Sequence, residues 1–419
     1  MIKRILNRIL NNIDLSKDEQ VRFLGEIIKI PAVAPSSGGC GEWDKVELIV
    51  EWARTHGFSD IERFDVEDLG VPSGSRPNVV VWLKGKRNAE RIHEDMPRLL
   101  VITHTDVVPP GDLKAWDSDP YSAVVSDGRI FGRGAEDNGQ SLTAALFAAR
   151  AVLDNEILPV RDVGLVMVAY EEIGNEKGIL HLMNEGFFKK NDLILVPDHG
   201  EPDGRLVEVS EKSLAWIKVT TKGKQCHSSR PDRGNNAHRA AMKFGTMVDE
   251  ALHNRFDHRD GLFDFPLSSF EPTKKVANIQ NVNTIPGEDI LYFDCRVLPR
   301  YRLNDIITEM RRIADTVEKV TGTSISLDPV LRDEATEPTP ADAPIVKMLL
   351  SAIDSVYNSN PYPGGIGGST AAAILRRAGY NAAVWETVDN TAHSPNEYAV
   401  IDNMVNDCKV FATLFTDGV

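Results

Sequence analysis

Leu99-Leu-Val-Ile-Thr-His-Thr-Asp106 decides the fold, because an apolar run of strand length ends directly in a histidine and an aspartate. Two more apolar runs end in acidic residues, namely Val163–Tyr170 before Glu171-Glu172 and Asp192–Val196 before Pro197-Asp198. Together with Asn78–Leu83 they alternate with helical segments, which indicates a doubly wound α/β sheet. Such sheets bind ligands at the carboxyl ends of their strands, so parallel neighbours would bring these polar residues together.

The chain around this core indicates two domains, as 419 residues also would. Residues 1 to about 57 have helical spacing of apolar residues with a turn at Pro31–Gly41, and a helix is predicted from about Gln140 to Leu153. From about Lys212 the pattern changes to alternating, half-buried strands accompanied by helices. We therefore predict a discontinuous catalytic domain, residues 1–211 and 331–419, with an inserted α+β domain at 212–330.

Composition and charge exclude several classes of function. The formal net charge of −15 disfavours nucleic acid or an acidic membrane as the main partner. The longest apolar runs are far shorter than the roughly 20 residues that a membrane-spanning helix needs. The amino terminus predicts an amphipathic helix rather than a signal peptide. Four scattered cysteines without a C-x-x-C pair fit a reducing cytoplasm, where we expect the protein.

The residues at the strand ends have the chemistry of a metal site. His104 and Asp106 are two apart, so on an extended backbone both side chains point to the same face. Asp106 would accept the proton of the second ring nitrogen of His104, or lie beside the metals. Glu171 and Glu172 repel each other unless a cation or a proton is present. Taken alone, each pair also fits an ordinary solvated strand end.

Two glycine-rich segments lack the spacing of nucleotide-binding motifs. In Gly132-Arg-Gly-Ala-Glu-Asp-Asn-Gly139 the third glycine is misplaced for a dinucleotide fingerprint, and Asp137 has the alternative role of a helix cap. Gly364-Gly-Ile-Gly-Gly-Ser-Thr370 lacks the Gly-Lys-Ser/Thr of a phosphate loop. It still precedes a predicted helix at Thr370–Ala378, so its backbone N–H groups are available to an anion. A nucleotide-binding α/β protein is thus a weaker alternative.

Four motifs in this order resemble one known family. They are His104-Thr-Asp-Val-Val-Pro109, Gly132-Arg-Gly-x-x-Asp-Asn-Gly139, Glu171-Glu172 and Ala392-His-Ser-Pro-Asn-Glu397. This set resembles the acetylornithine deacetylase, succinyl-diaminopimelate desuccinylase, aminoacylase and zinc carboxypeptidase family of dinuclear metallohydrolases. The resemblance runs from about residue 20 to about 415. It implies a zinc-peptidase-like catalytic domain, a mixed sheet flanked by helices, with an inserted lid and dimerisation domain.

The resemblance also implies a role for each residue of the metal centre. Asp137 would bridge two metal ions, with His104 and Asp198 completing one site and Glu172 and His393 the other. Glu171 would be the general base, with Asp106 beside it. Two such metals hold a water and lower its pKa, and Glu171 would take the water's proton as it attacks an amide carbonyl. Zinc suits this mixture of imidazole and carboxylate, with cobalt or manganese as alternatives.

The remaining candidate residues belong to the inserted domain or to the second glycine-rich segment. His227 looks like the lid histidine that reaches the partner's site in a homodimer and stabilises the oxyanion. Asn283 and Arg296 resemble substrate-contacting positions, and Gly368 and Ser369 are candidates through their backbone before the predicted helix. Each of the first three also fits a bland role, as a loop histidine, a turn asparagine or a surface arginine.

The substrate stays open between two classes of small molecule, N-acyl amino acids and short peptides. Desuccinylases of the family have Gly-Gly-Thr-Ser-Asp where this chain has Gly367-Gly-Ser-Thr-Ala371, which removes a partner for a diamino acid. Asp198 is typical of the family's dipeptidases and aminopeptidases, whereas the motif wording is closer to the deacetylase and desuccinylase branch. A non-catalytic, metal-binding member of the family is the further alternative.

Overall fold

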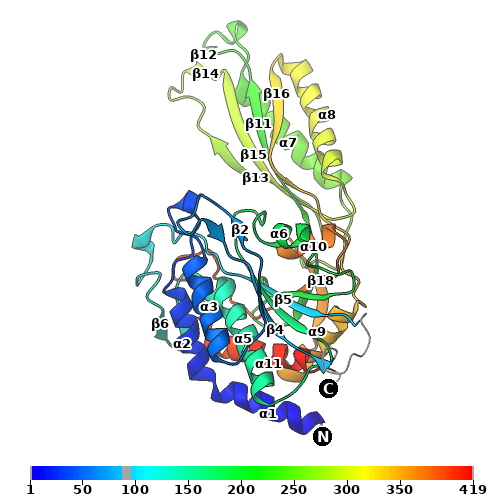
Figure 1. The fold of residues 1–419 in the computed structure, drawn as a ribbon. Helices are drawn as coiled ribbons and strands as arrows, with labels where there is room; N and C mark the ends of the chain where they lie inside the picture. Colours follow the sequence, from blue (N-terminus) through cyan, green and yellow to red (C-terminus); the bar gives the residue numbers. More distant parts are fainter. Residues whose placement is uncertain (1, 87–95, 418–419) are drawn as a thin grey trace. The chain divides into compact units, whose positions relative to one another are not determined.

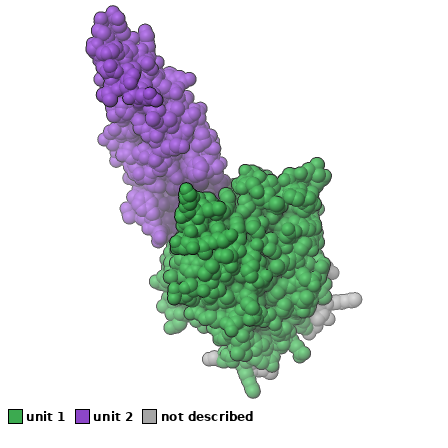
Figure 2. Space-filling view, turned by 90° about the vertical axis from the view of Figure 1, so that its left-hand side faces the viewer, with its two compact units in different colours: residues 1–209, 339–363, 370–419 green, residues 210–338, 364–369 purple. Residues whose placement is uncertain are grey.

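The computed structural model describes residues 2–86 and 96–417, which form two compact units. Unit 1 comprises residues 1–209, 339–363 and 370–419, and unit 2 comprises residues 210–338 and 364–369 (Figure 2). The sequence placed the corresponding boundaries at 211/212 and 330/331. The structure differs in that unit 2 also contains the end of the long strand 324–333, which the expected boundary cut, and the segment 364–369.

Unit 1 is an α/β unit built on one large mixed sheet. Its helices are α1 (Ile2–Leu15), α2 (Lys17–Ile28), α3 (Trp43–Thr55), α5 (Ser141–Asp154), α6 (Ile179–Asn184), α9 (Pro344–Tyr357), α10 (Ala371–Arg377) and α11 (Ile401–Phe415). The large sheet has the order β1 (Ile61–Arg63), β4 (Val79–Leu83), β8 (Val163–Val168), β5 (Leu99–His104), β9 (Leu193–Val196), β18 (Ala382–Val384), β10 (Leu206–Glu211) and β17 (Tyr362–Ile366). Short strands pair outside it: β2 (Val66–Glu67) with β3 (Ser75–Arg76), and β6 (Val124–Ser126) and β19 (Tyr398–Val400) with β7 (Arg129–Phe131).

The centre of this sheet is parallel. Strand β5 pairs in parallel with β8 and β9, and β9 pairs in parallel with β18. Strands β4 and β10 run antiparallel to their neighbours β8 and β18, so the sheet is mixed. The predicted fold class, a mixed sheet flanked by helices, is confirmed. Because β5, β8 and β9 are parallel neighbours, the residues that follow them meet at one edge of the sheet.

Both faces of the sheet are buried, which explains the nearly continuous apolar strands. Alternate side chains such as Leu100, Ile102 and Val166 pack with α6 and α10 in one hydrophobic cluster. The intervening residues, such as Val101 and Leu165, are also buried, and α5 and α9 contact the strands. Figure 1 shows α5 and α11 next to each other on one side of the sheet. The sheet is therefore a rigid base for side chains at its edge.

Unit 2 is a small α+β unit. Its four-stranded antiparallel sheet has the order β13 (Ser269–Val276), β15 (Glu288–Val297), β11 (Ser213–Lys222) and β16 (Ser324–Asp333). Helices α7 (Ala237–Arg255) and α8 (Leu303–Thr321) cover one face, and Phe244, Phe293 and Ile313 belong to the shared core. Strand β12 (Cys226–His227), which follows β11 in the chain, pairs with β14 (Thr284–Ile285), which precedes β15. The two strands form a short ribbon (Figure 1).

Among the residues that the structure describes, no helix is both long and apolar enough to span a bilayer. The amino-terminal segment forms α1, whose described part starts at Ile2 because Met1 lies outside the described residues. Residues 2–15 and 17–28 are thus helical, in agreement with the helical spacing of the sequence.

Candidate metal centre

Five of the expected ligands come from separate strand ends and loops of unit 1. His104 is the last residue of β5, Asp198 follows β9 after one proline, and Glu172 follows β8. Asp137 lies in η3 (Ala135–Gln140), the wide turn that leads into α5. His393 lies in the loop between β18 and β19, with a φ of 62°. The polar residues at the ends of the parallel strands β5, β8 and β9 thus lie close together, as the sequence predicts.

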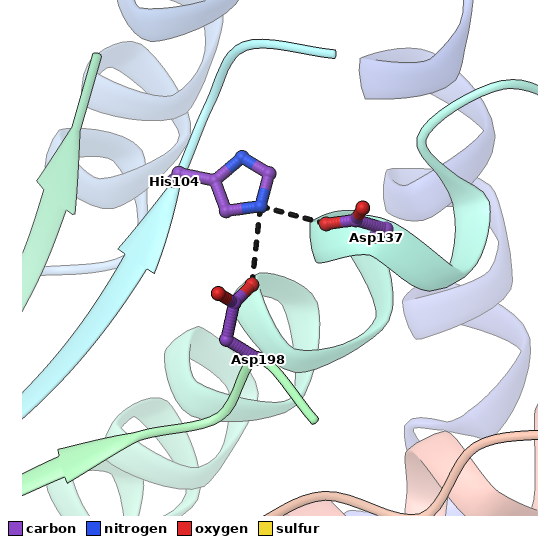
Figure 3. Close-up of side chains that lie close together, drawn as sticks. All are labelled: His104, Asp137 and Asp198. Carbon is purple, nitrogen blue, oxygen red and sulfur yellow. Dashed lines mark hydrogen bonds and ion pairs between the residues drawn. The ribbon is translucent and has the colours of Figure 1, made fainter. Parts of the chain in front are cut away.

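The first group joins His104, Asp137 and Asp198. The Nε2 atom of His104 lies 2.7 Å from Asp137 Oδ1 and 3.3 Å from Asp198 Oδ1. Figure 3 shows the imidazole at the end of β5 with both carboxylates directed at the same nitrogen. His104 is buried, and its Nε2 atom lies near both carboxylates.

The second group joins Asp137, Glu172 and His393. The Nε2 atom of His393 lies 3.0 Å from Asp137 Oδ2 and 3.1 Å from Glu172 Oε2. Asp137 therefore directs one oxygen to each histidine. His393 is 56% exposed at its side chain, against 8% for Glu172, so solvent reaches the centre from the His393 side.

Asp106 contacts the backbone of the glutamate pair. Its two carboxylate oxygens accept the N–H groups of Glu171 and Glu172, each at 3.0 Å. The Nδ1 atom of His104 lies 3.0 Å from the Asp106 carbonyl oxygen and 3.6 Å from its carboxylate. The expected tautomer-fixing contact is thus made mainly by the carbonyl, because the carboxylate is occupied by the two amides.

Glu171 is presented by a tight turn. Strand β8 stops at Val168, short of the predicted Tyr170, because Tyr170 has a φ of 65° in the left-handed region. The Tyr170 carbonyl accepts the N–H of Asn175 at 2.7 Å, and the Arg76 guanidinium lies 5.0 Å above its ring. The Asn175 side chain donates to Glu171 Oε1 at 3.2 Å. The Glu171 carboxylate is therefore oriented while remaining outside both ligand groups.

Protonation of the metal-free site follows from its burial and crowded charge. Burial, together with the charge of Asp198, raises the pKa of Glu171 to about 8. Burial also raises the pKa of Glu172 and of Asp198. Hydrogen bonds to Asp137 and Glu172 raise the pKa of His393 to about 10. Without a cation, protons must therefore neutralise part of this charge.

The donor set fits divalent metal ions. The candidate ligand atoms within each group all lie within 4.8 Å of one another. Two imidazoles and three carboxylates give a mixed nitrogen and oxygen shell that suits zinc and related ions. Asp137 belongs to both groups, so two ions can share it.

The expected substrate-contacting residues all belong to unit 2 and form two separate sets. The exposed His227 lies on β12, and the carbonyl of Asn283 accepts the N–H of Ser228, so these two residues are neighbours. Arg296 lies near the opposite end of β15, where it forms a two-point ion pair with Asp294 and donates to the Gly367 carbonyl at 2.9 Å. Gly368 and Ser369 follow directly in the chain.

Sequence reasoning gave no role to two buried glutamates beside the ligands. Glu136 precedes Asp137, and Glu397 follows His393 by four residues; their side chains join the two loops. Both lie within the motifs quoted above, and their place in those motifs was the one signal in the sequence that could have indicated a role. Their partners are some 250 residues away, which no local pattern reveals.

Comparisons with known proteins identify the family of this chain. The model of peptidase family M20/M25/M40 matches residues 100–417. An uncharacterised metallohydrolase of Methanocaldococcus jannaschii is 36% identical over 412 residues, covering 94% of this chain and 98% of the relative. Succinyl-diaminopimelate desuccinylase 2 of Shewanella loihica is 24% identical and covers 94% and 99% of the two chains.

The fold has close counterparts among solved structures. A dipeptidase of Saccharomyces cerevisiae superposes with a TM-score of 0.71 at 17% identity, covering 98% of each chain. At that identity the likeness concerns the fold. The family match over most of the chain and the archaeal relative carry the assignment: this protein belongs to peptidase family M20/M25/M40 and is a metal-dependent hydrolase of amide bonds.

Proposed function

We propose that the protein uses two divalent metal ions to hydrolyse the amide bond of a small N-acyl amino acid or a short peptide. The observation that carries this proposal is the sharing of Asp137, whose two oxygens point to His104 and to His393. His104 and Asp198 would complete one metal site, and Glu172 and His393 the other. Zinc is the proposed metal, with cobalt or manganese as substitutes.

Glu171 is the proposed general base. Bound divalent ions would supply Lewis acidity for the water and the amide oxygen. Glu171 takes the proton of the attacking water and returns it to the leaving nitrogen. Its burial and its hydrogen bond from Asn175 support this role, because they hold one carboxylate in place without engaging it in either ligand group. Asp106 fixes the backbone of the same turn through its two amide contacts.

Unit 2 is the proposed lid and dimerisation domain, close to the expected range 212–330, and the protein is proposed to be a homodimer. Glu288 and Arg296 are eight residues apart on β15, which is about 27 Å at the rise of an extended strand. His227 and Asn283 lie beyond the Glu288 end. A substrate of one or two residues extends only about 7 Å. His227 and Arg296 of one chain therefore cannot contact the same substrate, which supports donation of His227 from a partner.

Arg296, Gly368 and Ser369 are the proposed binding positions for the substrate in the same chain. Arg296 already binds a carboxylate, that of Asp294, at 2.8 and 3.1 Å. A guanidinium of this kind suits the two-point recognition of a substrate carboxylate. The four unpaired cysteines support a reducing compartment, so we propose a cytoplasmic location.

The substrate class divides between deacylation and peptide cleavage. The desuccinylase relative supports the first, and the presence of Asp198 rather than glutamate supports the second. The deciding experiment is a screen of N-succinyl and N-acetyl amino acids against dipeptides, with the purified full chain loaded with zinc or cobalt. We expect turnover of one class, loss of that turnover on chelation and recovery on adding metal.

Two outcomes of this screen contradict the proposal. Full activity after exhaustive chelation rejects the metal mechanism. A folded protein with two bound metals that turns over no amide in either class supports the non-catalytic alternative.

A further inference from the structure

Two buried carboxylates connect the loops that carry Asp137 and His393. Glu136 directly precedes Asp137 and is 3% exposed, and Glu397 is fully buried. Neither belongs to the two ligand groups. Glu136 accepts hydrogen bonds from the loop that carries His393, and Glu397 accepts hydrogen bonds from the turn that carries Asp137.

Glu136 organises the loop before His393. Its carboxylate accepts the N–H groups of Asp389 at 2.8 Å and Ala392 at 2.7 Å, and the hydroxyl of Thr391 at 2.9 Å. It also accepts the N–H of Thr391. Four donors from three residues of one loop thus converge on one carboxylate, directly before His393.

Glu397 organises the turn that carries Asp137. Its Oε1 atom accepts the N–H groups of Glu136 at 3.0 Å and Asp137 at 3.1 Å. Its Oε2 atom accepts Nη1 of the buried Arg133 at 2.5 Å, and its carbonyl accepts the N–H of Gly132 at 2.9 Å. Glu397, which belongs to the loop of His393, therefore binds the segment from Gly132 to Asp137 through four hydrogen bonds.

We propose that Glu136 and Glu397 are positioning residues that form a reciprocal clamp: each carboxylate, next to one metal ligand, fixes the backbone of the loop that carries the other. The clamp sets the separation of Asp137 and His393 before a metal binds. Charge-assisted hydrogen bonds of this kind are stronger than neutral ones. Losing the carboxylate would leave several buried N–H groups without an acceptor. This inference rests on the proposed two-metal function.

The two carboxylates predict different defects in metal binding. Glu136 fixes only the His393 loop, so its loss should weaken one of the two metal equivalents. Glu397 fixes the backbone of Asp137, which faces both histidines, so its loss should weaken both. Outer-shell contacts of metal sites are typically worth about 10–100-fold in affinity.

The experiment compares Glu136→Gln and Glu397→Gln in the full chain, titrated with cobalt under chelator competition and followed by the cobalt absorption spectrum. We expect Glu136→Gln to weaken one cobalt equivalent by about 10–100-fold, with an altered spectrum, and Glu397→Gln to weaken both. The matched control is Asp192→Asn. Asp192 is a buried carboxylate that binds Arg98 and the N–H of Lys189 at the amino end of β9, away from both loops. It should lower the melting temperature and leave both cobalt affinities unchanged.

Wild-type affinities and spectra in both glutamine variants, with the fold intact by circular dichroism, would overturn the clamp. Cobalt affinities that change no more than those of Asp192→Asn would also overturn the clamp, because the role of the two glutamates would then be structural only. If a glutamine variant does not fold, Thr391→Val removes one donor to Glu136, and a weaker cobalt equivalent is again expected. Binding of one cobalt ion by the wild type contradicts the two-metal proposal instead, and the clamp is then judged on that ion.

Discussion

The candidate metal centre of unit 1 and the proposed substrate-contacting residues of unit 2 are built in opposite ways. In unit 1, ligands from five chain segments converge within hydrogen-bonding distance, and the acidic ones are largely buried. In unit 2, His227 is exposed on a short ribbon beyond the Glu288 end of β15, whereas Arg296, about 27 Å from Glu288 by strand rise, is paired with Asp294. The candidate ligands are thus already close together within one unit, whereas the proposed recognition residues of unit 2 are dispersed.

The largest expected effect concerns the preorganised side of this contrast. Glu171→Gln should lower kcat by at least about 10²-fold, because general-base catalysis contributes about 10²–10⁴-fold. The fold and both metals should be retained, since Glu171 lies outside the two ligand groups. Steady-state kinetics with metal analysis checks this, with Glu172→Ala as the contrasting variant that should lose one metal. Near-normal turnover of Glu171→Gln rejects the assignment of the base.

The next prediction tests the dispersed residues of unit 2. His227→Ala should lower kcat by about 10²–10³-fold with little change in KM, because an oxyanion donor acts mainly in the transition state. His253→Ala is the control, since His253 is a partly exposed histidine of α7 in the same unit.

Mixing two inactive variants sharpens the test of donation between chains. Inactive His227→Ala combined with inactive Glu171→Ala should regain activity, because a heterodimer contains one site with both groups intact. Subunit exchange proven with differently tagged chains, yet without recovery, rejects donation from the partner.

The smallest effect is a pH dependence of stability that only the metal-free centre should show. The pKa of Glu171 rises from 4.5 to about 8 on folding, and that of His393 from 6.5 to about 10. Between each pair of values the folded chain binds more protons than the unfolded chain, so the free energy of unfolding falls as pH rises. The melting temperature of metal-free protein should therefore drop between about pH 5 and 9.

Metal loading should flatten that slope, because bound cations replace the protons. Melting curves of zinc-loaded and metal-free protein over this pH range make the comparison, with Glu171→Gln expected to remove part of the slope. Parallel curves for the two forms contradict the proposal that the metal binds at His393 and beside Glu171.

Sequence patterns predicted the central strands of the sheet well. Strands 79–83, 99–104 and 193–196 lie within about one residue of their predicted positions. The strand predicted at 163–170 was two residues too long, because Tyr170 has a left-handed backbone conformation and β8 ends at Val168. The roles of Asp106 and Glu397 were less accessible, because both depend on backbone N–H groups brought close by folding.

The sequence by itself determined the chemistry of this protein and the edge of the sheet where that chemistry lies. Apolar runs of strand length dictate burial on both faces, and the polar residues that interrupt them must then lie at the strand ends. The shared position of Asp137 between His104 and His393 was implied only by the family resemblance, and the tertiary structure supplies its geometry. Only the tertiary structure decided that Glu136 and Glu397 accept hydrogen bonds from each other's loops. The physical reason is that loops lack a repeating pattern. Their geometry comes from hydrogen bonds between residues some 250 positions apart, which form only when the sheet has brought the loops together.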